Sequence, residues 1–311
     1  MRCFSDYKTA LPEICSPAID LCTTFFPKRN KKSYLCGSRK KTFYSGYECI
    51  IISRNYHPPP PPAAENPAIQ KISFSTRKTL TLAILAGIYI AMGGLLSLVI
   101  GYGFPEITTN NPGLQRLLSG AMFPLGLILV VFAGAELFTG NNAVLIPGLC
   151  NHKYGLIPVL RNWLLVYIGN FIGAIFFVYV MVYLADIVKS DPWNTAIQNI
   201  AEAKVGMSWG VTFIKGIGAN WFVCLAVWLG IACRSAAGKF IGLWFPVMCF
   251  VALGYEHSIA NMFFIPLGML QGADVEIYDF VVCNLIPATL GNITGGAFFV
   301  GGLYWLAYHK S

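Results

Sequence analysis

The amino-acid sequence predicts an all-α polytopic membrane protein with six transmembrane helices, arranged as two inverted repeats of three helices each. Three observations support this fold class. Of the 311 residues, 56 % are hydrophobic and only 12 % are charged, which is about half the charged fraction of an ordinary soluble domain. Six long apolar segments follow a polar N-terminal region. The second and the fifth of these segments carry matching polar interruptions.

Residues 1–67 are predicted to form a separate leader and linker. They contain the basic runs KRNKK and SRKK and end in HPPPPPAAENP, whose proline run is expected to be extended. Basic, hydroxyl-rich leaders are typical of organelle transit peptides, although Asp6, Glu13, Asp20 and Glu48 are unusual in one. The leader is interpreted as a transit peptide, with a disordered tail on the inner face of the membrane as the alternative.

The membrane domain, residues 68–311, is expected to span the bilayer six times. Its apolar segments run near 78–104, 114–150, 158–186, 207–232, 239–271 and 278–308. One crossing needs about 20 apolar residues, so the second and fifth segments are too long for a single helix. Each contains a polar break, GAELFTGNN or GYEHSIANM, which predicts two half-helices joined by a loop at membrane depth. Such loops occur only where protein or a water-filled cavity surrounds them.

The charges on the connecting loops predict the orientation of the spans. One side carries Arg77, Lys78, Lys153, Arg161, Arg234, Lys239 and Lys310, and the other carries Glu106, Asp186, Asp191, Glu202, Asp274, Glu276 and Asp279. Basic loops mark the inner side of a membrane. Both termini are therefore expected on that side.

The polar breaks reveal an internal repeat. The glycine, glutamate and asparagine of GAELFTGN align without gaps with those of GYEHSIAN, and NWLLVYIGNFIG aligns in the same way with NLIPATLGNITG. The second segment runs inward and the fifth runs outward, so the two halves are inverted copies. Inverted repeats with broken helices place a binding or permeation site near the membrane midplane.

From about residue 75 to its end, the chain resembles the formate/nitrite transporter family. The motifs GAELFTGN, NWLLVYIGN, NWFVCLAVW, EHSIANMFFIPLGM and NLIPATLGN carry the resemblance, in this order, and the leader has no counterpart. The chain is most similar to the eukaryotic, chloroplast-type branch. The resemblance implies an aquaporin-like fold and a homopentamer with one pore in each protomer. It also implies transport of small monovalent anions such as formate, nitrite and bicarbonate.

The resemblance further implies two apolar constrictions with a polar midpoint between them. The outer constriction would be formed by Phe123 and Phe250, and the inner one by Leu127, Leu137 and Phe138. Ordinary helix packing is the alternative role for these five residues.

His257 is expected between the two constrictions, where it would donate a hydrogen bond or a proton to the anion. Its ordinary pKa of about 6.5 suits either role, and a buried structural histidine is the alternative. By the same resemblance Thr139 faces this histidine, Asn220 orients its ring, and Lys204 attracts anions below the outer mouth and favours their protonation. An exposed lysine at a helix end is the alternative for Lys204.

Four residues at the breaks are expected to be structural. Glu136 and Glu256 are predicted to accept backbone N–H groups that the breaks leave unpaired, and Asn141 and Asn261 are predicted to cap the second half-helices.

The sequence therefore predicts a proton-linked channel or transporter for small anions. Nitrite is placed ahead of formate and bicarbonate, with nitrite uptake for nitrate assimilation or bicarbonate supply across a chloroplast envelope as roles and the plasma membrane as the alternative location. An aquaporin-type pore for neutral solutes is less expected, because paired Asn-Pro-Ala motifs are missing. No enzyme, metal, cofactor or nucleic-acid partner is expected. The sequence has no HExxH motif, no glycine-rich phosphate loop and no CxxC spacing among its ten cysteines.

Overall fold

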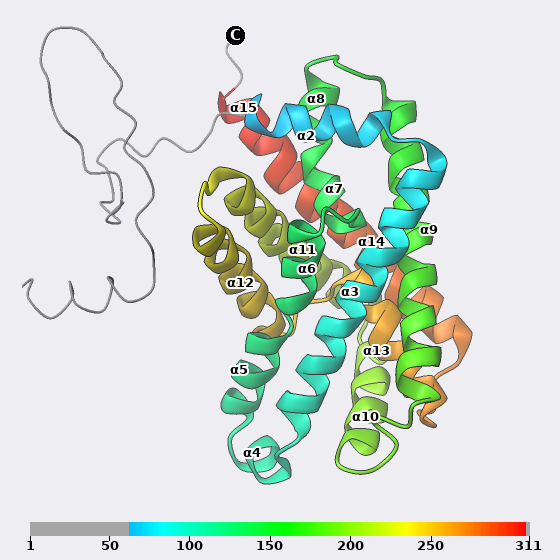
Figure 1. The fold of residues 1–311 in the computed structure, drawn as a ribbon. Helices are drawn as coiled ribbons and strands as arrows, with labels where there is room; N and C mark the ends of the chain where they lie inside the picture. The colour runs from blue at the N-terminus through cyan, green and yellow to red at the C-terminus, as the bar shows by residue number, and fades with distance from the viewer. Residues whose placement is uncertain (1–61, 309–311) are drawn as a thin grey trace, which may run out of the picture. The chain divides into compact units, whose positions relative to one another are not determined.

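The computed structural model describes residues 62–308, and every regular element in this range is a helix (Figure 1). The leader and most of the predicted linker lie outside the described residues. The end of the linker differs from expectation, because residues 62–67 form the first turns of helix α2, Pro62–Ser73, instead of an extended chain. Proline is favoured in the first turn of a helix, and the alanines and glutamate that follow are good helix formers.

The six predicted spans are present. Span one is α3 (Thr76–Tyr102). Span three is α9 (Leu156–Phe176), continued by η1 (Phe177–Tyr183), and span four is α11 (Trp209–Ala232). The last span consists of η2 (Asp279–Leu285), α14 (Ile286–Ile293), η3 (Thr294–Gly302) and α15 (Leu303–Tyr308). Together with Pro112–Phe132, these are the helices of the described range that are long and apolar enough to cross a membrane.

The second and fifth spans are broken, as predicted. The second consists of α5 (Pro112–Met122) and α6 (Leu125–Phe132), a loop, and then α7 (Phe138–Val144) and α8 (Ile146–Cys150). The fifth consists of α12 (Ala236–Ala252), a loop, and α13 (Ser258–Leu270). Two further helices, α4 (Pro105–Asn110) and α10 (Trp193–Val205), lie outside the spans.

The two breaks have the same backbone geometry. Gly134 and Gly254 each have a φ of +71°, in the left-handed region that glycine adopts without steric cost. One residue later, the N–H of Ala135 donates to Val130 at 2.9 Å, and that of Tyr255 donates to Phe250 at 3.1 Å. The aligned glycines of the sequence repeat therefore end the first half-helix in the same way twice.

The glycines of the third and sixth spans permit close helix packing. A Cβ added to Gly173 would lie 2.0 Å from the carbonyl oxygen of Ile84, and one added to Gly295 would lie 2.3 Å from that of Ile217. Span three thus contacts span one, and span six contacts span four, backbone against backbone. Only glycine, which has no Cβ, allows this close approach.

A hydrogen bond joins the two halves at equivalent positions. Tyr167 and Thr289 align in the repeat of the third and sixth spans, and their hydroxyl oxygens lie 2.8 Å apart. Equivalent residues can touch only near the axis that relates the halves. In Figure 1, α2 and α8 lie at one end of the helix bundle, and α4 and α10 lie at the opposite end.

Candidate functional site

The second half-helices of the two broken spans begin at the same place in the protein core. His257 is the N-cap of α13, Thr139 is near the start of α7, and Nε2 of the histidine lies 2.9 Å from Oγ1 of the threonine. The side chains are 2 % and 0 % exposed. The structure therefore brings together the two residues that the sequence placed at the polar midpoint.

The backbone of α13 selects the tautomer of His257. The N–H of Ala260 donates to Nδ1 of the ring at 3.1 Å. A nitrogen that accepts a hydrogen bond carries no proton, so the neutral ring carries its proton on Nε2. Nε2–H then donates to Thr139, whose own hydroxyl proton remains available to another acceptor. The midpoint thus offers hydrogen-bond donors.

Asn220 supports the threonine and not the histidine ring. Its Nδ2 lies 3.2 Å from the carbonyl oxygen of Thr139 and 2.6 Å from that of Asn292. The thiol of Cys224 donates to the same Thr139 carbonyl at 3.3 Å. The described hydrogen bonds of the His257 ring go to Thr139 and Ala260. The expected contact between Asn220 and the ring is therefore replaced by a contact with the backbone of its partner.

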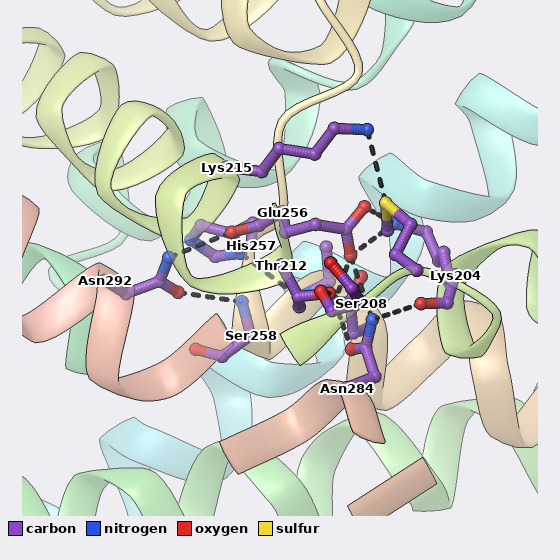
Figure 2. A network of polar contacts seen from close by, with 12 residues as sticks. Lys204, Ser208, Thr212, Lys215, Glu256, His257, Ser258, Asn284 and Asn292 are labelled. Atoms are coloured by element: carbon purple, nitrogen blue, oxygen red, sulfur yellow. Dashed lines mark hydrogen bonds and ion pairs between the residues drawn. The ribbon is translucent and has the colours of Figure 1, made fainter. Parts of the chain in front are cut away.

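Lys204 forms an ion pair beside the midpoint. Its Nζ lies 2.9 and 3.1 Å from the two carboxylate oxygens of Glu256, the residue that precedes His257 (Figure 2). The side chain of Lys204 is 17 % exposed and that of Glu256 is 4 % exposed. The lysine therefore reaches from α10 towards the break and does not stand free at the end of its helix.

The first half contains a matching ion pair that the sequence analysis missed. Lys71 on α2 bonds Glu136 at 2.5 Å, with side chains 21 % and 3 % exposed. A weak signal was present, because Lys71, Ser75 and Thr79 share the spacing of Lys204, Ser208 and Thr212. Extending the repeat alignment back to the leader boundary would have found it.

The asparagines of the breaks are not helix caps, as the sequence had suggested. Leu137 and His257 hold the N-cap positions, and Asn141 and Asn261 lie one turn inside the half-helices. Asn141 donates to Glu136 at 2.8 Å, and Asn261 donates to Glu256 at 2.7 Å. Each asparagine therefore holds the carboxylate that faces the lysine.

The unpaired backbone groups are bonded by two other asparagines. Asn292 accepts from the N–H of Ser258 at 2.8 Å and donates to the carbonyls of Gly216 and Glu256 at 2.8 and 2.9 Å (Figure 2). Asn170 makes the equivalent bonds in the first half, to Phe138 at 3.0 Å and to Ala83 and Glu136 at 2.8 and 2.9 Å. The prediction that Glu136 and Glu256 accept these N–H groups is wrong, because their carboxylates bond lysine and asparagine side chains.

The residues expected at the constrictions are buried around the midpoint. The exposed fractions of Phe123, Phe250, Leu127, Leu137 and Phe138 are all 2–3 %, and they belong to one hydrophobic cluster. The rings of Phe123 and Phe250 meet edge to face at 5.8 Å, and Phe250 stacks on His257 at 5.8 Å. On the other side, Phe138 meets the ring of Tyr167 at 4.9 Å. Aromatic groups thus flank the polar contact.

Comparison with known proteins gives consistent matches over the described helices. A family model described as formate/nitrite transporter matches residues 62–306. The "Probable formate transporter" of Methanothermobacter thermautotrophicus is 42 % identical over 247 residues, which cover 75 % of this chain and 89 % of that protein.

Two solved structures share the fold. An "FNT family ion channel" matches with a TM-score of 0.72 at 29 % identity, covering 79 % of this chain and 97 % of its own. A "Pentameric formate channel with formate bound" matches with a TM-score of 0.65 at 36 % identity, covering 76 % and 98 %.

Proposed function

Because this chain belongs to the formate/nitrite transporter family, we propose that it conducts small monovalent anions across a membrane. The observation that carries the proposal is the contact between His257 and Thr139, where the two broken spans meet inside an apolar core. The related solved structure is a pentamer with formate bound, which supports a homopentamer with one pathway in each protomer.

The midpoint suits an anion that has lost most of its water. Moving a carboxylate into an apolar interior costs much free energy unless hydrogen-bond donors replace the water. The Nε2–H of His257, the hydroxyl of Thr139 and the positive N-terminal end of α13 supply such donors and charge. Lys204, on the α10 side, would draw the anion towards this point.

We propose that His257 donates a hydrogen bond and keeps its proton. Giving up a proton would first require a second one on Nδ1, where the N–H of Ala260 already points. The proton that neutralises the anion would then come from hydronium in the solution that reaches Lys204, whose side chain is 17 % exposed. A neutral acid would pass the rings of Phe123 and Phe250 more easily than an anion.

Formate is the substrate that the comparisons favour, because a relative and a solved structure are named for it. The sequence had placed nitrite first, and nitrite and bicarbonate share formate's planar shape and single charge. The chloroplast envelope as location, the transit peptide and the inner position of both termini stay predictions from the sequence.

The test is uptake of labelled formate, nitrite and bicarbonate into proteoliposomes between pH 5 and pH 8. The parent is compared with His257→Ala and with His152→Asn, an exposed histidine at a positive-φ turn that asparagine tolerates. We expect uptake that rises on the acidic side, at least a tenfold loss in His257→Ala, and no change in His152→Asn. A parent that takes up none of the three anions would refute the function. A folded His257→Ala variant with full uptake would refute the role of the midpoint.

A further inference from the structure

A continuous series of side chains links Lys204 to His257. The lysine Nζ lies 5.8 Å from the ring centroid of Phe264. Phe264 stacks on Phe123 with centroids 6.4 Å apart and ring planes at 20°. Phe123 meets Phe250, and Phe250 stacks on His257, each pair at 5.8 Å. The ion pair of Lys204 with Glu256 closes this series into a loop beside the midpoint.

Phe264 is the member of this series for which the anion pathway above gives no role. It lies on α13 two turns after His257, so both side chains project from the same face of the helix. Its side chain is half-buried, whereas Phe123 and Phe250 are 2 % exposed. Phe264 therefore lies between the ammonium of Lys204 and Phe123 of the predicted outer constriction.

We propose that Phe264 is a positioning residue for anion selection, because its ring fixes both the ammonium of Lys204 and the ring of Phe123. In this way it limits the size of the carboxylate that the outer constriction admits. The inference rests on the proposed anion pathway.

The ring acts on Lys204 through the geometry of the ammonium group. Two hydrogen bonds to Glu256, at 2.9 and 3.1 Å, use part of its three donors. The electron-rich face of Phe264 attracts the cation on another side. The ammonium is thereby held in one place with a donor left for an approaching anion.

The same ring acts on Phe123 by filling the space beside it. Without the ring, Phe123 would lose a stacking partner and face a void, and a side chain beside a void can change its rotamer. The gap between Phe123 and Phe250 would then admit carboxylates larger than formate. Acetate, which adds one methyl group, is the smallest such probe.

The experiment compares the parent, Phe264→Leu, Phe264→Tyr and Phe298→Leu in proteoliposomes. Phe264→Leu removes the flat ring, and Phe264→Tyr keeps it. Phe298→Leu removes an exposed ring on the last span. The readouts are the ratio of acetate to formate uptake and the KM for formate, because neither depends on how much protein is active.

We expect Phe264→Leu to raise the acetate-to-formate ratio about two- to tenfold, the range that the loss of one aromatic pair corresponds to. Its KM for formate should also rise, while Phe264→Tyr and Phe298→Leu match the parent. If Phe264→Leu fails to assemble, Phe264→Met removes the ring with less loss of volume and should show the same increase. An unchanged ratio in an assembled Phe264→Leu or Phe264→Met variant overturns the inference, as does an equal rise in Phe298→Leu. A parent without formate uptake refutes the proposed function instead.

Discussion

Replacing Asn292 by alanine tests whether one side chain holds the second break together. The Asn292 amide bonds the N–H of Ser258 and the carbonyls of Gly216 and Glu256 at 2.8–2.9 Å, and it is fully buried. Alanine at this position would leave all three backbone groups without these bonds. The N-terminal end of α13, which carries His257, would lose the bonds that Asn292 makes, and would keep the bonds from Glu256 N–H to Lys215 and from Asn261 to Asn284.

The expected loss of stability follows from the number of bonds. A buried polar group left without a partner costs about 1–3 kcal/mol. The carbonyl of Gly216 keeps its helical bond inside α11, so the N–H of Ser258 and the carbonyl of Glu256 are the groups left unpaired. Together they cost at least about 2 kcal/mol even when water partly replaces the amide. A change of 1 kcal/mol shifts the Tm of a domain of this size by about 2–4 °C. We therefore expect the Tm of Asn292→Ala to fall by roughly 4–8 °C.

The assay is thermal unfolding of the purified oligomer in detergent, followed by the loss of the size-exclusion peak. Asn170→Ala removes the equivalent bonds in the first half and should lower the Tm by a similar amount. Asn199→Ala, at an exposed position of α10, should leave it unchanged. A shift of Asn292→Ala no larger than that of Asn199→Ala would refute the reasoning. So would a large difference between Asn292→Ala and Asn170→Ala.

Three further predictions follow from the same geometry. Thr139→Val removes the hydroxyl that bonds His257 at nearly constant volume, and anion uptake should fall at least tenfold with an unchanged size-exclusion profile. Glu256→Gln should lower the free energy of unfolding by about 1–3 kcal/mol, because Lys204 loses its charged partner but reaches water. Adding Lys204→Gln should restore part of this free energy, and thermal unfolding of the two single variants and the double variant measures the difference. Gly134→Ala should cost about 1–2 kcal/mol, because its φ of +71° is left-handed. Gly113→Ala, in helix α5, adds a Cβ that would meet no other atom within 4 Å, so it should leave the Tm unchanged or raise it. Equal effects at the two glycines would contradict the backbone argument.

The spans and their breaks were predictable because each leaves a local signal. Apolar segments longer than one crossing, with a glycine in the middle, correspond to the broken helices of the structure. Gly134 and Gly254 repeat in sequence because the same positive φ recurs in both halves. A backbone requirement of this kind restricts the residue type directly, so it survives in a single sequence.

The partners of buried polar groups were not predictable in the same way. The N–H of Phe138 donates to Asn170, and that of Ser258 donates to Asn292, each more than thirty residues away in the sequence. An asparagine close to a break in sequence resembles a cap, but only the packing of span three against span two shows which amide reaches the free N–H group. Asn141 was therefore assigned a role that a more distant residue performs.

The prediction that Thr139 faces His257 came from the family resemblance. The two residues are 118 positions apart, and no periodicity relates them. Lys71 was missed because its repeat signal lies between the leader and the first predicted apolar segment, which begins near residue 78, whereas the repeat was sought within the apolar segments.

The bond between Tyr167 and Thr289 joins equivalent positions that carry different residues. If two identical three-span chains were paired by the same axis, the residue at this position of one chain would face the same residue of the other chain. Two tyrosines would compete for the space that one now fills, and two threonines would hold their hydroxyls too far apart to meet at 2.8 Å. The present contact therefore depends on different residues at two equivalent positions, which a single chain containing both halves can hold.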